Sequence, residues 1–326
     1  MSENIILVTV SDDRFGRKDG NYGKTQDKIE HIFKINTHFG INKFLTVKWV
    51  DIESSPFYKT NESLLKHTDA GKNGRAYKPY AILQGLKSIN EGDYLIYTDC
   101  SPEMWSMGRG FMVKPEYFDV EVLKNLCKNN NDILTCFVKW KNSNLAKGDN
   151  GIHTHRWFTT NRCIDTMGLR FYEDGYQHAS GMWVIRKTAE TIEFVDEWLK
   201  WNLIDECCAL GSVGGTADEY WNDPIESTKV GHRHDQSISG LLLNKTNQKF
   251  VDILYNEMNP YNFLQFARKN TEYKFIESLP PLNIGDKVIN RQGTEMEVWK
   301  MEGDKYVVGK LQESCYASER QNLKKI

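Results

Sequence analysis

The chain has 326 residues, with 44 acidic and 42 basic side chains and a formal net charge of −2. Hydrophobic residues make up 40% of the sequence and charged residues 26%. This composition excludes a disordered tail, a collagen-like rod and a coiled coil. The balanced charge argues against wholesale binding of nucleic acid or an anionic membrane through bulk positive charge. The length predicts one large domain, or a core with a small appendage.

Membrane and secretion signals are not evident in the sequence. No apolar run is long enough to cross a bilayer, and residues 1–4 lack the start of a secretion signal. None of the seven cysteines falls in a C-x-x-C pair. We therefore expect no membrane span, a reduced cytoplasmic setting, and cysteines that are buried small residues rather than zinc ligands or disulfides.

The first part of the chain predicts a β-α-β order. Residues 5–10 are a short apolar, β-branched run, typical of a buried parallel strand. Residues 24–40 have the apolar spacing of a helix that ends at Gly40, and residues 43–50 predict a second strand. This order predicts a mostly parallel sheet with helices on its faces, and residues 51–76 read as a loop at its active site.

The next elements repeat this order. Residues 78–89 predict a helix, and residues 94–98 a strand that ends on Asp99. Residues 133–138 and 181–185 predict further strands. Two more helices are expected, one N-capped by Thr188 and one over residues 237–243.

The last 45 or so residues change to short strands separated by turns, after Pro280-Pro281. They predict a small five-stranded, SH3-like β-barrel that serves in protein contact or packing. We expect a main α/β domain over residues 1–278 and this appendage over residues 279–326.

Asp99 is the first candidate functional residue, because open α/β sheets bind ligands at the carboxyl ends of their strands. The segment Asp99-Cys100-Ser101-Pro102-Glu103 resembles the Asp-x-Asp arrangement that presents a divalent cation to a diphosphate. Ser101 stands where the second aspartate would be, and Glu103 is the nearest alternative carboxylate. The alternative is a strand-end aspartate with only a turn-forming role.

A second candidate is the concentration of polar residues in Gly231-His232-Arg233-His234-Asp235-Gln236-Ser237. His234 could ligate a metal or relay a proton. Asp235 could act as a base. Alternatively, Asp235 is the N-cap of the following helix and the histidines are only solvated side chains.

Two further segments carry candidates. Arg75 and Lys78 precede a helix and suit an anion such as phosphate, unless they are surface cations. Between residues 177 and 183, the small residues Ser180 and Gly181 would let a sugar approach closely beside His178, unless they serve tight packing.

Several motifs occur in a characteristic order. They are Lys78-Pro79-Tyr80, the segment from Gly92-Asp93 to Asp99, Trp157-Phe158-Thr159-Thr160, Ala179-Ser180-Gly181 with Arg186-Lys187, and His232-Arg233-His234-Asp235-Gln236-Ser237. Over residues 5–250 this ordered set resembles a family of GT-A-type glycosyltransferases found in glycan-synthesis clusters and in some viruses. The sequence departs from the family in its Asp-Cys-Ser segment and in its C-terminal appendage.

The resemblance implies a GT-A-like, Rossmann-type mixed sheet and a hexosyl- or pentosyltransferase. Such an enzyme takes a nucleotide-diphosphate sugar, with a UDP-sugar favoured, and usually Mn²⁺ or Mg²⁺. The sugar goes to a hydroxyl of a glycan or another acceptor. For a viral protein, the expected setting is the host cytoplasm.

The site hypothesis assigns roles to individual residues. Asp99 binds the cation, helped by Ser101 or Glu103 and by His234. Asp235 is the base of an inverting reaction, with Glu173 and Asp174 in reserve, or flanks the anomeric carbon with Gln236 in a retaining one. The donor is expected to contact Thr9, Val10, Ser11, Arg75, Lys78, Tyr97, Thr98 and Asp99. The sugars are expected to contact Trp105, His178, Ser180, Gly181 and Gln236.

Two other functions stay open. One is a glycan- or protein-binding module without catalysis, which the incomplete Asp-x-Asp motif and the appendage suggest. The other is transfer to a modified DNA base, which needs a basic channel that the global charge does not favour.

Overall fold

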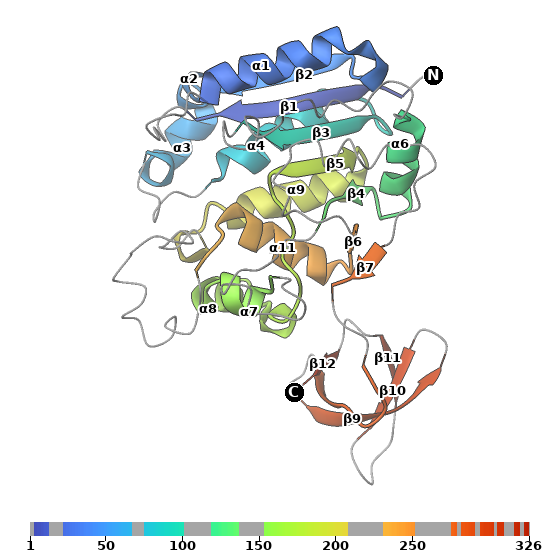
Figure 1. Cartoon of the computed structure of the whole chain (residues 1–326). Helices are drawn as coiled ribbons and strands as arrows, with labels where there is room; N and C mark the ends of the chain where they lie inside the picture. Colours follow the sequence, from blue (N-terminus) through green and yellow to red (C-terminus); the bar gives the residue numbers. More distant parts are fainter. Residues whose placement is uncertain are drawn as a thin grey trace, which may run out of the picture.

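The structure is a computed structural model of the chain, shown in Figure 1. It describes residues 3–12, 22–66, 75–100, 119–136, 153–207, 231–251, 275–278, 282–290, 294–302, 305–309, 316–319 and 323–325. The described part is an α/β unit built on a mixed sheet, followed by a separate antiparallel sheet.

The main sheet has five strands. They are β1 (Ile5–Ser11), β2 (Lys43–Lys48), β3 (Tyr94–Asp99), β4 (Ile133–Leu134) and β5 (Met182–Arg186), in the order β2-β1-β3-β5-β4. Strand β1 is parallel to both β2 and β3, whereas β5 is antiparallel to both of its neighbours. Four strands therefore run in one direction, which confirms the predicted mostly parallel, mixed sheet.

Helices cover both faces of this sheet because side chains alternate along its strands. Ile5 and Leu7 point to the face covered by α1 (Tyr22–Ile35) and α6 (Val120–Lys128). Ile6 and Val8 point to the opposite face, where the second hydrophobic cluster lies. That cluster includes side chains of α4 (Tyr77–Lys87), α9 (Ala189–Trp201) and α11 (Asp235–Lys245). The sheet is thus buried on both sides.

Gly85 sets the close approach of α4 to the sheet. A Cβ atom at this position would lie 2.6 Å from both Leu95 Cδ1 and Val8 Cγ2. Helix α4 therefore packs directly on β1 and β3, and this packing fixes the position of its first turn at the carboxyl ends of these strands.

The region predicted as a loop over residues 51–76 contains two helices instead. Helix α2 (Trp49–Glu53) follows β2 directly, so β2 ends two residues before the predicted strand end. Helix α3 (Pro56–Leu65) begins after Ser55, whose hydroxyl accepts a hydrogen bond from the Tyr58 backbone N–H. A serine cap followed by proline is a helix start, and this local signal outweighs the polar composition of the segment.

Shorter elements connect these layers. They are η1 (Thr37–Phe39), α7 (His155–Phe158), α8 (Asn161–Thr166), η4 (Arg170–Tyr172), η5 (Asp205–Cys207), and the paired strands β6 (Lys249–Val251) and β7 (Phe275–Glu277). The single helix predicted over residues 24–40 is wrong at its end, because α1 ends at Ile35, Asn36 is not helical, and Gly40, with a φ of 70°, ends the separate η1. The Thr188 hydroxyl caps α9, as predicted.

The C-terminal residues form a second sheet. Its strands are β8 (Lys287–Asn290), β9 (Glu295–Glu302), β10 (Lys305–Gly309), β11 (Tyr316–Glu319) and β12 (Leu323–Lys325), in the antiparallel order β11-β10-β9-β8-β12. Val288, Val298 and Leu323 belong to its own small core. A β-rich appendage was predicted correctly, but among the described strands no pairing closes this sheet into a barrel.

Two predictions about the whole chain can be compared with the described part. None of the helices described is long and apolar enough to span a membrane. The five described cysteines are buried, as predicted; they are Cys100, Cys127, Cys136, Cys163 and Cys207.

Candidate functional site

The candidate site lies at the carboxyl ends of β1 and β3. The chain passes from β1 to β2 on one side and then crosses to β3 on the other, so the strand order reverses between β1 and β3. Open α/β sheets bind their ligands at the carboxyl ends of the strands at such a point. Asp99 is the last residue of β3 and pairs in register with Val10 of β1. Asp99 therefore lies where this fold places ligands.

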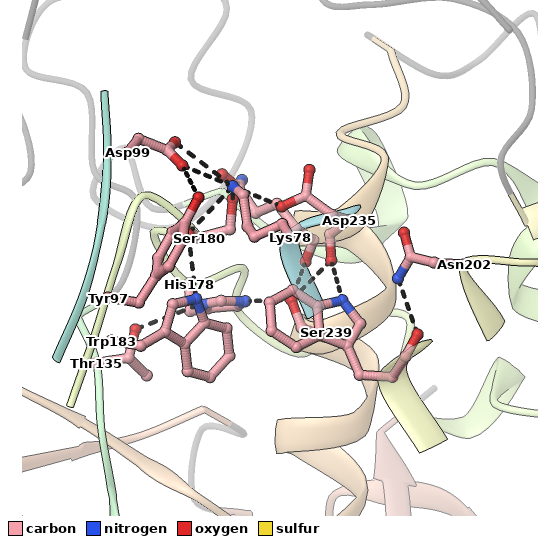
Figure 2. Close-up of polar contacts among 12 residues, drawn as sticks. Lys78, Tyr97, Asp99, Thr135, His178, Ser180, Trp183, Asn202, Asp235 and Ser239 are labelled. Carbon is pink, nitrogen blue, oxygen red and sulfur yellow. Dashed lines mark hydrogen bonds and ion pairs between the residues drawn. The ribbon is translucent and has the colours of Figure 1, made fainter. Parts of the chain in front are cut away.

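Lys78 is the centre of this site (Figure 2). Its Nζ atom lies 2.8 Å from Asp235 Oδ2 and 3.1 Å from Asp99 Oδ1. It also lies 3.3 Å from both the carbonyl oxygen and the Oγ atom of Ser180. Four segments that are distant in the sequence thus meet at one ammonium group: the first turn of α4, the end of β3, the approach to β5 and the start of α11.

The ammonium of Lys78 is buried and charged. Its side chain is only 2% exposed, as is that of Asp235, whereas the Asp99 side chain is 26% exposed. Burial alone would lower the pKa of Lys78, but the negative charges of Asp235 and Asp99 outweigh it and raise this pKa above its ordinary value. An ammonium has three N–H donors, and these oxygens occupy them. Lys78 therefore holds the two aspartates together.

Two further residues contribute to the environment of Asp99. The Tyr97 hydroxyl donates a 2.7 Å hydrogen bond to Asp99 Oδ1, which fixes the carboxylate. Burial and the Asp99 charge raise the pKa of Tyr97 well above its usual value, so this hydroxyl keeps its proton. Arg75 is half-buried, and although burial lowers its pKa, Tyr77, Asp235 and Asp99 outweigh burial and raise it. Arg75 is thus a second cation, and the charges of both aspartates raise its pKa.

The start of α11 is unusual at His234. This residue has a φ of 49° and a ψ of −123°, a region that costs a side-chain-bearing residue about 1–3 kcal/mol. Strain of this kind concentrates at functional sites. His234, rather than Asp235, occupies the N-cap position, and Asp235 is the first helical residue. The alternative role of Asp235 as N-cap is therefore wrong, because its carboxylate is turned to Lys78.

Behind Asp235 lies a chain of buried hydrogen bonds (Figure 2). His178 Nδ1 is 3.2 Å from the Thr135 hydroxyl, and His178 Nε2 is 2.6 Å from the Ser239 hydroxyl. Ser239 donates its proton to the Asp235 carbonyl at 2.7 Å, so His178 must be the donor to Ser239 and the acceptor from Thr135. His178 is fully buried, and burial, with the nearby Lys78 charge, lowers its pKa to about 3. It therefore stays neutral and supports α11 from within, in place of the predicted contact with a sugar.

The end of β1 is held by a residue outside the predicted set. Gln26 of α1 is fully buried and donates to the Thr9 carbonyl, the Thr9 hydroxyl and the Val47 carbonyl. Its side-chain oxygen accepts a 2.9 Å hydrogen bond from the Ser11 hydroxyl. The side chains of Thr9 and Ser11 are thus used internally, and Val10 belongs to the core. These residues therefore border the site through their backbone atoms.

The remaining predicted residues divide into four groups. Gly181 and Thr98 flank Asp99, because the Gly181 carbonyl accepts from the Asp99 N–H at 2.9 Å, and Thr98 is the preceding residue, with a buried side chain. Gln236 donates to the side chain of Gln177 at 2.9 Å. Glu173 and Asp174 are ion-paired with Arg156 and do not join the oxygens around Lys78. Ser101, Glu103 and Trp105 lie outside the described residues.

The described residues do not fit a divalent metal at this position. Within the described ranges, no three or more His, Cys, Asp or Glu side chains are grouped as metal ligands. The metal set expected from the sequence included Asp99 and His234, but the Asp99 carboxylate, like that of Asp235, is ion-paired with Lys78.

Two residues around the site, Gln26 and Ser239, were not among the predicted residues, although helical spacing could have revealed them. Gln26 lies three and seven residues before Ile29 and Phe33, on the buried face of α1. Ser239 lies four residues after Asp235, on the same face of α11. A polar residue on a buried helical face must find a partner, and each of these binds a strand end or a helix start.

Comparisons of the chain with protein-family models, with curated proteins and with solved structures find no match. The arrangement of these residues and the motifs that they belong to are therefore the basis for a proposed function.

Proposed function

We propose that this chain is a glycosyltransferase that moves a hexose or pentose from a nucleotide-diphosphate sugar to a hydroxyl of a glycan or another acceptor. One observation carries the proposal. Asp99 at the end of β3 and Asp235 at the start of α11 are joined by one buried lysine at the strand-order reversal of the sheet.

The motifs that resemble GT-A-type enzymes support this function because they meet in space. Lys78 belongs to the first motif of the ordered set, Asp99 to the second, Ser180 to the fourth and Asp235 to the last. Their side chains converge on one point, although 157 residues separate Lys78 from Asp235, the difference of 235 and 78. A mostly parallel sheet with one antiparallel strand is in keeping with a GT-A-like architecture.

In the proposed inverting reaction, Asp235 accepts the proton of the acceptor hydroxyl. The acceptor oxygen forms its bond to the anomeric carbon while the bond from that carbon to the diphosphate oxygen breaks, and the nucleoside diphosphate leaves with the electron pair. Asp99, fixed by the Tyr97 hydroxyl, borders the donor, with the β1 backbone at residues 9–11 beside it. A retaining reaction would use Asp235 and Gln236 on either side of the anomeric carbon.

For the C-terminal antiparallel sheet we propose a role in binding an acceptor or a partner. Strands β8 to β11 are sequential neighbours and β12 returns to pair with β8, so this appendage is one continuous sheet with its own small core. The glycan acceptor is favoured over DNA because the chain is almost neutral overall.

The proposal is tested with Asp99→Asn and Asp235→Asn, measured for donor hydrolysis and for transfer with a panel of nucleotide-diphosphate sugars. Loss of a general base lowers the rate by about 10²–10⁴-fold, so we expect Asp235→Asn to reduce transfer by this order. Asp196→Asn is the matched control, because Asp196 is an exposed carboxylate on α9. Wild-type rates in both site variants would refute the function.

A further inference from the structure

The oxygens around Lys78 form a cation-binding site that the chain fills itself. Two carboxylates, a hydroxyl and a backbone carbonyl all lie within 3.4 Å of the Nζ atom. Oxygen ligands of this kind, with two negative charges, are what Mg²⁺ and Mn²⁺ select in proteins. Here a lysine that is 2% exposed supplies the positive charge.

We propose that the Lys78 ammonium is the built-in cation of this site, and that a nucleoside diphosphate binds here without a divalent metal ion. The second part of this inference rests on the proposed function. A metal ion would have to take both carboxylates from a buried ammonium, leaving that positive charge beside the metal and without its partners.

The charges of the site are consistent with this role. Arg75 and Lys78 carry two positive charges, and Asp99 and Asp235 carry two negative charges, so the group is neutral before the reaction. When Asp235 accepts the acceptor proton, the group gains one positive charge as the diphosphate departs. The chain's own residues therefore provide the neutralisation that a metal ion would otherwise supply.

The first test concerns the cation site alone and needs no substrate. Lys78→Ala removes the ammonium and leaves the surrounding carboxylate, hydroxyl and carbonyl oxygens without a cation. We therefore expect millimolar Mn²⁺ to raise the melting temperature of this variant. The wild type should show no such rise. Lys78→Ala combined with Asp99→Asn should lose the Mn²⁺ effect, and Lys87→Ala, an exposed lysine of the same helix, should behave as wild type.

The second test uses the wild type only, so it remains decisive if Lys78→Ala does not fold. Binding of UDP, GDP, CDP and dTDP is measured by calorimetry in EDTA and in Mn²⁺. We expect the dissociation constant of the nucleotide that binds to change by less than about twofold.

Three results would count against these ideas in different ways. A loss of affinity of about tenfold or more in EDTA, or a wild-type Mn²⁺ site that Asp99→Asn removes, would overturn the built-in cation and leave the glycosyltransferase function standing. A folded Lys78→Ala variant that gains no Mn²⁺ response would also overturn it. Failure of every nucleoside diphosphate to bind in either medium would instead refute the proposed function.

Discussion

Replacing Lys78 with methionine should strongly destabilise the fold, because it removes a buried charge but little volume. The Asp235 carboxylate, 2% exposed, would remain in the interior without its cation. Breaking a buried ion pair in this way costs about 3–5 kcal/mol. The loss of the ion pair with Asp99 adds less to this free-energy cost, since the Asp99 side chain is 26% exposed and solvent screens its charge.

The partner of this prediction is the double variant Lys78→Met with Asp235→Asn, which removes both charges. The double variant should lose less free energy of unfolding than the sum of the losses in the two single variants, by about 1–3 kcal/mol. Urea unfolding followed by circular dichroism measures each free energy of unfolding. Because the folded-state pKa of Lys78 is raised above 10.5, its stabilisation is complete at neutral pH and is lost only as the pH rises through that folded-state pKa.

Lys87→Met provides the control, since Lys87 is an exposed residue of the same helix. It should change stability by less than about 0.5 kcal/mol. Additive losses from Lys78→Met and Asp235→Asn, to within about 0.5 kcal/mol, would show that the two side chains do not interact, and the site as described would be wrong.

Two further predictions concern the packing and protonation around this site. Gly85→Ala should destabilise the protein by about 1–3 kcal/mol, because its Cβ would meet Leu95 and Val8 at 2.6 Å. Thermal unfolding measures this loss, with Gln84→Ala, at an exposed neighbouring position, as the control. A Gly85→Ala variant as stable as the wild type would contradict the close approach of α4. His178 is neutral when folded, with its pKa lowered to about 3 by burial and by Lys78. Stability should therefore fall as the pH drops from about 6.5 towards 3, by on the order of 1 kcal/mol per unit, since unfolding lets this histidine take a proton. In urea unfolding over this range, His178→Gln should flatten the dependence and the exposed His31→Gln should not; equal slopes would refute the assignment.

Much of the α/β unit could be predicted because its signals are local. The apolar run at residues 5–10 and the strand ending on Asp99 follow from short patterns of burial, and both occur within a residue of the expected bounds. The loop expected over residues 51–76 was wrong as far as residue 65, because composition was weighed above the Ser55-Pro56 helix start.

The site could be predicted only in part, since residue type and order do not determine side-chain partners. Asp99, Lys78 and Asp235 were selected, and the structure brings them together. The sequence suggested that Lys78 faces a phosphate and His178 a sugar, whereas both are buried and bonded to other residues of the chain. Their roles depend in part on contacts between segments more than 60 residues apart, such as His178 with Ser239, which differ by 61.

The convergence at Lys78 also ties the site to the order in which the chain can be assembled. During synthesis, α4 and β3 emerge before the start of α11, so Lys78 and Asp99 are both made before Asp235, the most buried partner of Lys78. A truncated product that ends before residue 235 would contain the first β-α-β elements but no complete site. The candidate site is therefore complete only when α11 packs against the rest of the α/β unit.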